Sequence, residues 1–330
     1  AEQHPRRKLP VVQVRGVTVA AVLPYWPLLG LDRIHIPDDG FTSDLYNGEL
    51  PARVLLGKLV ASGQAPVWSS EACSGFPIGA GGVGEPLGTF GFALLPPVLA
   101  LDVLLLILLL VAAHGAYGLA RRLGASLPGA VLAGATYAGS GYFVTQLRHL
   151  SVLATVAWLP LGLLLLDGAL AARSPRAALG EAGEAEPSAA GRWLRLGLFG
   201  LVFGEQALSG FPQSAYISAL VYIAWASTLL LGGRGRTGGW PAALKLGLGT
   251  CGALGLGAAL GAVALLPLAE LGSLSDRSGD MGWQFASMLP YSWRDALNFL
   301  VPYINGDAAD DSYVGATVFW EVYGYVGLAT

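Results

Sequence analysis

Residues 99–119 read LALDVLLLILLLVAAHGAYGL, an apolar run interrupted by one acid, Asp102, and one histidine, His114. The hydrocarbon core of a bilayer is about 30 Å thick, and an α-helix needs roughly 20 apolar residues to cross it. The run has that length, so it predicts a transmembrane helix. Asp102 lies near one end of the run, where it either faces a cavity or is solvated at the membrane interface. For His114, which is deeper, we favour helix packing.

The composition of the whole chain extends this prediction to a polytopic membrane protein. Of its 330 residues, 54% are hydrophobic and only 12% are charged, and the mean hydropathy is +0.56. Soluble domains carry about a quarter charged residues. The net charge is −3 and the basic residues form no block, so we expect membrane lipids and no nucleic acid as partners. Cys73 and Cys251 fall in a predicted loop and a predicted span, which argues against a disulfide.

Other apolar runs are separated by polar or Gly/Pro-rich breaks, so we predict an all-α polytopic bundle in one transmembrane domain, 1–330. The chain lacks an initiator methionine and ends in an apolar stretch, FWEVYGYVGLAT, so we expect a fragment of a longer protein. The segments from the second to the seventh span occupy residues 99–268. The predicted spans are residues 12–31, 99–119, 127–144, 150–170, 193–209, 213–232 and 242–268, with an eighth beginning at 318.

The distribution of Lys and Arg predicts the orientation of the chain. Most of the 19 basic residues flank the ends that face the cytoplasm if the N-terminus is inside. By the positive-inside rule, the long segments 32–98 and 271–317 then lie outside the cell. The second of these, 271–317, mixes tryptophans with aspartates, which suits either sugar binding or anchoring at the membrane interface. We therefore expect any chemistry on the external face.

The stretch PDDGFTSDLYNGELPAR, residues 37–53, gathers acids at the start of the first external loop. Asp38 and Asp39 sit in a good turn sequence. Asp44 either caps the next helix or serves as a general base toward a hydroxyl. No cofactor is required by this pattern, but together the three aspartates could hold a divalent cation such as Mg²⁺ or Mn²⁺.

The same loop continues into GELPARVLLGKLVASG, whose apolar residues recur at near-helical spacing. Arg53 and Lys58 fall off that apolar face. The pattern predicts a juxtamembrane helix lying on the membrane surface, with Glu49 at its solvated start.

Polar groups also gather at two predicted outer turns. Arg148 and His149, next to Gln146, suit a phosphate held at the membrane surface, or they simply touch lipid headgroups. At the other turn, Gln213 and Tyr216 line a cavity or make hydrogen bonds between helices.

Further acids and amides lie near the ends of spans. Glu205 and Gln206, near the end of the fifth span, have the same two interpretations as Gln213 and Tyr216. Asp167, near the inner end of its span, is predicted to be solvated.

Several segments follow one another along the chain: SDLYNGELPAR, SGQAPVWSSEACSGFPIGA, RRLGAS, SGYFV, RHLSVLATVAWLPLGLLLLD, LSGFPQSAY and LPYSWRDALNFLVPYINGD. Their order and spacing resemble the bacterial YfhO-like membrane proteins, which belong to the GT-C glycosyltransferase superfamily. The Trp68 segment departs from the family, because it reads WSSEA where a Trp-Asn-Pro-like sequence is usual, and family members continue through several more spans.

This resemblance implies a GT-C fold in the bacterial cytoplasmic membrane, with an active site on the external or periplasmic face. It implies a polyprenyl-phosphate-linked sugar as donor and a cell-envelope glycan, lipid or protein as acceptor. Asp44 matches the acidic residue of the first outer loop that commonly acts as the base, with Asp38 and Asp39 as weaker candidates. Arg148 and His149 match an outer turn, and their phosphate-binding role is inferred from charge. Trp68 falls in a matching segment and is a candidate cavity residue.

Sequence alone therefore favours a membrane glycosyltransferase, with two alternatives. A transporter or flippase of lipid-linked intermediates would carry ionisable groups near the bilayer midplane and internal repeats, whereas here the polar groups gather at outer helix ends. A noncatalytic subunit of an envelope-assembly complex would have the same composition.

Overall fold

The computed structural model describes residues 11–34, 43–81, 84–171, 188–232, 239–275, 278–279, 282–307, 310–315 and 317–326. Within these residues all regular structure is helical, which confirms the all-α class, and an isolated antiparallel bridge joins Ser69 to Phe76. Asp38 and Asp39 lie outside the described residues.

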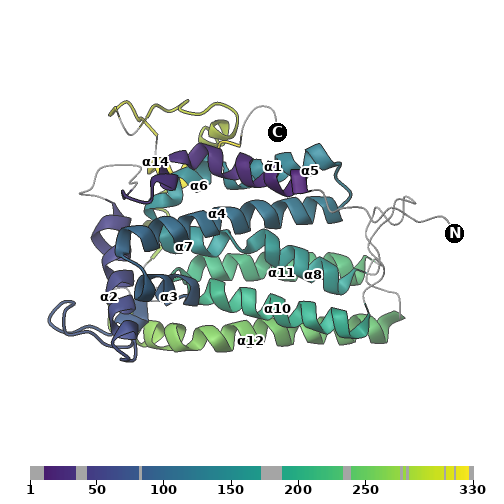
Figure 1. The fold of residues 1–330 in the computed structure, drawn as a ribbon, viewed down its shortest axis with the longest axis horizontal. Helices are drawn as coiled ribbons and strands as arrows, with labels where there is room; N and C mark the ends of the chain where they lie inside the picture. Colours follow the sequence, from purple (N-terminus) through teal and green to yellow (C-terminus); the bar gives the residue numbers. More distant parts are fainter. Residues whose placement is uncertain are drawn as a thin grey trace.

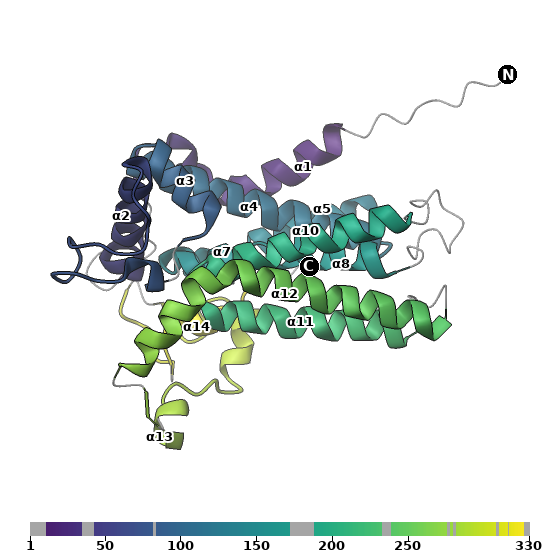
Figure 2. The ribbon, with the colours of Figure 1, turned by 90° about the horizontal axis from the view of Figure 1, so that it is seen from below.

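Most of the helical chain is arranged lengthwise in a layered bundle (Figures 1 and 2). Among the described residues, four helical segments are long and apolar enough to cross a membrane: Pro97–Arg122, Leu150–Leu170, Pro212–Leu231 and Gly239–Ser273. The lengthwise helices are α1 (Val11–Val22), α4 (Pro97–Arg122), α5 (Leu127–Ala138), α7 (Leu150–Val156), α8 (Leu159–Leu170), α10 (Ala189–Leu208), α11 (Pro212–Leu231) and α12 (Gly239–Ser273).

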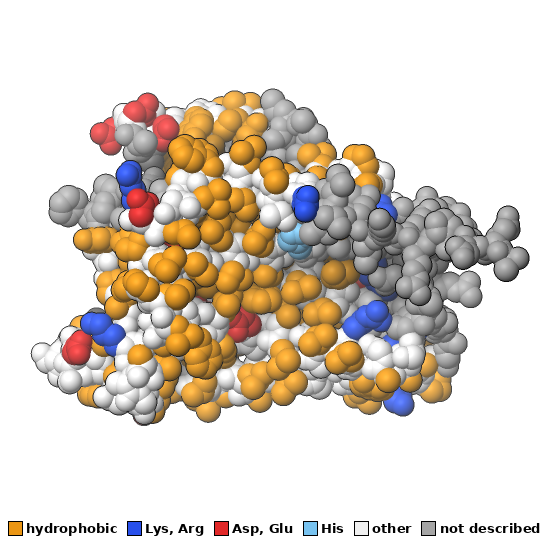
Figure 3. Space-filling view, in the orientation of Figure 1, with side chains coloured by type: hydrophobic (Ala, Val, Ile, Leu, Met, Phe, Trp, Pro, Cys, Tyr) orange, Lys and Arg blue, Asp and Glu red, His pale blue; other side chains and the backbone are white. Residues whose placement is uncertain are grey.

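The shorter helical elements gather at one end of the bundle, where α4 begins and α12 ends, and we call this the loop end (Figures 1 and 2). The helix predicted after Glu49 is present there as α2, and it crosses the end of the lengthwise helices. Figure 3 shows hydrophobic side chains over the middle of one face of the molecule, with charged side chains mainly toward the two ends. The short helices are α2 (Leu50–Ala61), α3 (Pro86–Leu94), α6 (Gly141–Thr145), α13 (Gly282–Ala286) and α14 (Phe319–Val322). The short 3-10 and π elements are η1 (Leu23–Gly30), η2 (Leu45–Glu49), η3 (Ile78–Gly81), η4 (Gln146–Arg148) and η5 (Asp295–Phe299).

The first predicted span, 12–31, is α-helical only as far as Val22. The chain then continues as the 3-10 helix η1, which contains Pro24 and Pro27, and Tyr25 leaves helical geometry with φ −111°. Proline lacks an amide hydrogen and its ring clashes with the preceding turn, so two prolines three residues apart prevent a continuous α-helix.

Two other predicted spans are divided. In 127–144, α5 ends at Ala138, and Ser140 begins α6 by accepting a hydrogen bond from the Phe143 amide. In 150–170, α7 ends before α8, which carries Pro160 in its first turn. The stretch around 318, predicted to begin an eighth span, contains the four-residue helix α14.

Glycines at four-residue spacing bring α10 and α12 close together. A side chain on Gly257 of α12 would place its Cβ 2.8 Å from the carbonyl oxygen of Gly200 on α10. A Cβ on Gly204 would lie 2.9 Å from the Leu260 side chain, and one on Gly261 would lie 2.5 Å from the Cβ of Ala207. Small residues four apart allow two helix backbones to pack tightly where no hydrophobic effect drives association, as in lipid.

A buried hydrogen-bond network joins α7, α10 and α11 around Gln206. The Gln206 amide nitrogen donates to the Thr155 carbonyl oxygen over 2.9 Å, and the Tyr222 hydroxyl donates to the Gln206 carbonyl oxygen over 3.0 Å. Ser218 lies 3.4 Å from the same amide nitrogen. Of the two interpretations of Gln206, the structure shows the helix-to-helix hydrogen bond.

Asp167 is fully buried, so the prediction that it is solvated is wrong. Its carboxylate pairs with Arg122, whose Nε lies 2.5 Å from Oδ1. Arg122, Arg195 and Arg192 also donate to the carbonyl oxygens of residues 167, 168 and 169, at the C-terminus of α8. The Asp167 carbonyl also accepts from the Ala171 amide over 2.9 Å. The last carbonyls of a helix carry its negative dipole end, which explains why three arginines converge there.

Candidate functional site

Asp44, just before η2, and His149, just before α7, meet at the loop end, although they are 105 positions apart in the sequence. The carboxylate Oδ2 of Asp44 lies 3.0 Å from Nε2 of His149. Asp44 occupies the N-cap position of η2 but makes no capping hydrogen bond. Its side chain is 67% exposed, whereas that of His149 is 14% exposed. The carboxylate is therefore held on one side by the imidazole and open to a reactant on the other.

The hydrogen bonds around His149 determine where its protons lie. The Gln146 amide nitrogen donates to the Trp320 carbonyl oxygen over 3.2 Å, which orients Oε1 of Gln146 toward Nδ1 of His149 at 2.7 Å. Oε1 can only accept, so Nδ1 carries a proton. Nε2 faces the Asp44 carboxylate, so a proton on Nε2 as well makes His149 an imidazolium and its contact with Asp44 an ion pair.

Arg148 lies beside this pair but is buried. Its guanidinium carbon lies 3.5 Å from the centre of the Trp320 ring. The centres of the Trp320 and His149 rings are 6.3 Å apart, in an edge-to-face arrangement. A guanidinium stacked on an aromatic face is stabilised by the ring quadrupole. The segment that carries Trp320 thus covers Arg148 and His149, the two basic side chains that the sequence singled out.

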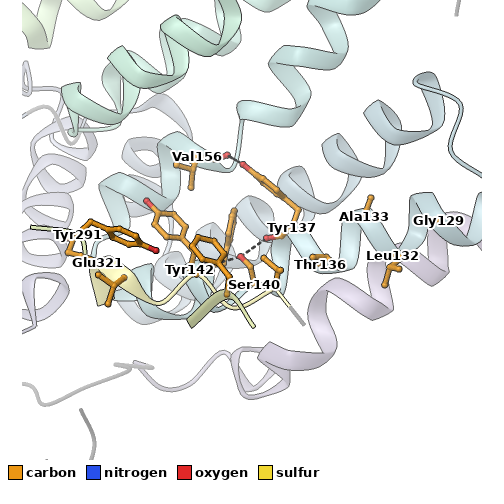
Figure 4. A pocket seen from close by; sticks show the side chains of 15 residues that line it. Gly129, Leu132, Ala133, Thr136, Tyr137, Ser140, Tyr142, Val156, Tyr291 and Glu321 are labelled. Atoms are coloured by element: carbon orange, nitrogen blue, oxygen red, sulfur yellow. Dashed lines mark hydrogen bonds between the residues drawn. The ribbon is translucent and has the colours of Figure 1, made fainter. Parts of the chain in front are cut away.

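Two adjoining cavities share the residues Tyr142, Tyr291, Glu321 and Val322, and the second of them is also lined by Gln146. The first has a volume of about 720 Å³ and runs along α5, with Tyr142, Tyr291 and Glu321 at one end and Gly129 and Leu132 toward the other (Figure 4). The second has a volume of about 470 Å³ and is lined by Gln146 and Gln213. Together they form an amphipathic site, apolar along the helix and polar near His149.

Of the residues predicted to line a cavity, the structure places only Gln213 in this site. Glu205 lines a different cavity, described below. Tyr216, one turn further along α11, is exposed and lines none of these cavities, and the same holds for Trp68 in its loop. Asp102 is fully buried within α4. It lines none of these cavities and is not solvated at an interface, so neither interpretation of this residue holds.

Glu205 lines a groove of about 590 Å³ between α3, α4 and α10. Its Oε1 accepts a hydrogen bond from the Leu87 amide over 3.4 Å, in the first turn of α3. Apart from Glu205 and Trp158, the described lining is aliphatic, aromatic, proline or glycine. Glu205 therefore lines a cavity, as expected from the sequence, but this cavity is not the one that Gln213 lines.

Arg53 is completely buried, so its predicted position off the packed face of α2 is wrong. Its Nη2 lies 3.0 Å from Oε1 of Glu85, which is also buried, just before α3. Burial raises the pKa of Glu85 to about 8, against the opposing effect of Arg53. α2 buries Leu50, Arg53, Leu56 and Gly57 because Gly57 lies against the backbone of Phe92, bringing α2 onto α3.

Glu49 also departs from its predicted role as the solvated start of a helix. Its Oε2 accepts a hydrogen bond from the Ser151 amide over 2.7 Å, at the beginning of α7. Burial raises the pKa of Glu49, while Arg53 and this hydrogen bond act in the opposite direction. Glu49 therefore ties η2 to α7 and fixes the position of Asp44 relative to His149.

Sequence reasoning missed Glu321 and Glu85. Glu321 is the one acid in FWEVYGYVGLAT, and an ionisable residue in an otherwise apolar stretch is a usable signal. Glu85 precedes a proline that begins a helix, but only the fold shows that Arg53 faces it. Among the described residues, no group of three or more His, Cys, Asp or Glu side chains is placed to hold a metal ion.

Comparison of the chain with protein-family models, curated proteins and solved structures finds no match. The chemistry of the site is therefore argued from its own residues.

Proposed function

We propose that this chain belongs to a polytopic GT-C-type, YfhO-like glycosyltransferase of the bacterial cytoplasmic membrane. It would transfer a sugar from a polyprenyl-phosphate donor to a cell-envelope acceptor. The observation that carries the proposal is the exposed carboxylate of Asp44, held 3.0 Å from His149, which is hydrogen-bonded to Gln146 at the edge of an amphipathic cavity.

The proposed topology has seven membrane-crossing segments, with the loop end outside the cell. Its support is the lengthwise arrangement of α1, α4, α5 with α6, α7 with α8, α10, α11 and α12 (Figures 1 and 2). The end opposite the loop end carries Arg121, Arg122, Arg192 and Arg195, in agreement with the positive-inside rule.

In the proposed reaction, Asp44 acts as the general base. The acceptor hydroxyl gives its proton to the Asp44 carboxylate while its oxygen bonds to the anomeric carbon of the donor sugar. The bond between that carbon and the phosphate oxygen breaks, and polyprenyl phosphate leaves with the electron pair. A positioned base of this kind contributes about 10²–10⁴-fold to a rate.

The leaving phosphate would be stabilised by the positive charge at the turn before α7. His149, when protonated, would be the partly exposed cation there, and Arg148 lies behind it against Trp320. Preorganised charge in a site with little water is an effective way to stabilise a developing anion. A divalent cation bound through Asp44, with Asp38 and Asp39, would serve the same purpose.

The test uses the purified full-length protein in liposomes with a panel of polyprenyl-phosphate sugars, each with and without Mg²⁺ or Mn²⁺. The proposal predicts release of polyprenyl phosphate from at least one donor, dependent on an added envelope acceptor. Turnover restricted to the metal-containing arm would identify a metal-dependent enzyme. Absence of turnover with every donor and acceptor fraction would contradict the proposal.

A second candidate, a transporter of lipid-linked intermediates, is favoured by one observation. Glu205 places a carboxyl group in an apolar groove between helices, which is where transporters keep ionisable residues. Transfer of a fluorescent polyprenyl-linked sugar between leaflets, lost in Glu205→Gln and retained in Asp44→Asn, would support this candidate over the enzyme.

A further inference from the structure

The two adjoining cavities differ in charge from the turn with Arg148 and His149, where the donor phosphate is proposed to bind. Both are lined by Glu321, and among the described residues that line either one there is no Lys, Arg or His. A phosphate or carboxylate group in this space would face a carboxylate with no cation in the lining, and like charges repel each other. The cavities therefore suit an uncharged head group.

The polar end of the site offers groups that bind hydroxyls. Gln213 supplies an amide, Tyr142 and Tyr291 line the shared wall, and Glu321 supplies a carboxylate acceptor. Amides both donate and accept hydrogen bonds, and carboxylates accept several. An array of such groups with aromatic side chains, and without a fixed cation, matches a polyhydroxyl head such as a sugar.

The apolar end has the dimensions of one membrane leaflet. Gly129, Leu132, Ala133 and Thr136 lie on one face of α5, and Tyr137 follows them toward the polar end (Figure 4). From Gly129 to Tyr137 the helix rises about 12 Å, at 1.5 Å per residue. Half of a hydrocarbon core is about 15 Å. This groove therefore suits an acyl chain from one leaflet.

We propose that the two cavities form one binding site for a glycolipid, a lipid with acyl chains along α5 and an uncharged polyhydroxyl head at Gln213 and Glu321. Given the proposed glycosyltransferase function, on which this assignment rests, the glycolipid is the acceptor. Gln146 lines the head-group cavity and contacts His149, so the head group lies one side chain away from the Asp44 pair.

The experiment measures lipid binding to the purified full-length protein by native mass spectrometry, with glucosyl diacylglycerol and phosphatidylglycerol of identical acyl chains. We expect the glycolipid to bind about tenfold more tightly than the anionic lipid, a difference of one or two hydrogen bonds. Gln213→Leu should remove most of that preference, and Leu132→Trp, which fills the groove, should weaken both lipids. Glu321→Gln should improve binding of phosphatidylglycerol.

Tyr216→Leu is the matched control, because Tyr216 lies on the same helix as Gln213 but outside both cavities. Equal binding of the two lipids by the wild type, or an unchanged preference in both Gln213→Leu and Glu321→Gln, would overturn the assignment. Selective binding without sugar transfer from any donor would contradict the glycosyltransferase function and leave the glycolipid site standing. Transfer without selective binding would overturn only the glycolipid site.

Discussion

Replacing Glu85 with glutamine tests whether the buried pair between α2 and α3 is more stable with Glu85 neutral or ionised. Glu85 and Arg53 are both buried and lie 3.0 Å apart, yet burial raises the pKa of Glu85 to about 8. In the unfolded chain this carboxyl has its ordinary pKa of 4.5. Between these two values the folded protein keeps a proton that the unfolded chain has released.

The sign of the pH dependence follows from this difference in bound protons. Below pH 4.5 the acid is neutral in both states and costs nothing. As the pH rises toward 8, the free energy of unfolding falls by about 1.4 kcal/mol per pH unit, to a total of at most about 5 kcal/mol. Above pH 8 the folded carboxyl is also ionised, and the contribution of Glu85 no longer changes.

Glutamine has the shape of the neutral acid at every pH. We therefore expect Glu85→Gln to match the wild type within about 1 kcal/mol at pH 5, and to exceed its stability by several kcal/mol at pH 9. The assay is equilibrium unfolding of the purified protein in mixed micelles at pH 5, 7 and 9. Glu71→Gln, an exposed acid in the same loop, is the control and should change little.

The opposite result would refute this reasoning. If the ionised pair with Arg53 is the stable form, removing one partner leaves a buried guanidinium without its counter-charge. Glu85→Gln would then lose about 3–5 kcal/mol at pH 7 and pH 9.

Two further predictions concern the packing of the bundle. Tyr222→Phe removes the hydroxyl that donates to Gln206 and should lower the free energy of unfolding by about 0.6–1.7 kcal/mol in the same assay, without affecting donor turnover. Gly257→Ala places a methyl group 2.8 Å from the Gly200 carbonyl oxygen and should cost about 1–3 kcal/mol, whereas Gly255→Ala, with open space around it, should be neutral or slightly stabilising. Equal effects of the two glycine substitutions would contradict the close packing of α10 and α12.

The helical class could be predicted from the sequence because apolar runs of span length are a local signal. Whether each predicted span forms one continuous helix was harder to predict. Pro24 and Pro27, which prevent a continuous α-helix after Val22, were visible in the sequence, but an apolar run of span length does not register them. The break near Ser140 likewise depends on a serine that caps a new helix, a local feature that hydrophobicity does not report.

Charge in the sequence singled out individual residues of the candidate site, but it did not show which of them would meet. Asp44 and His149 were each singled out, and the structure brings them together. Arg53 and Asp167 were misjudged because the partners that bury them, Glu85 and Arg122, are distant in sequence. Periodicity separates polar from apolar faces, but it does not show which charged residue will meet an opposite charge inside the fold.

The most direct measurement of the central claim is the initial rate of sugar transfer from a polyprenyl-phosphate donor by wild type, Asp44→Asn and Glu71→Gln. All three are compared at equal amounts of inserted, folded protein. We expect Asp44→Asn to lose about 10²–10⁴-fold in rate, the contribution of a general base, while Glu71→Gln retains the wild-type rate. An Asp44→Asn protein that transfers sugar as fast as the wild type would contradict the role assigned to this carboxylate.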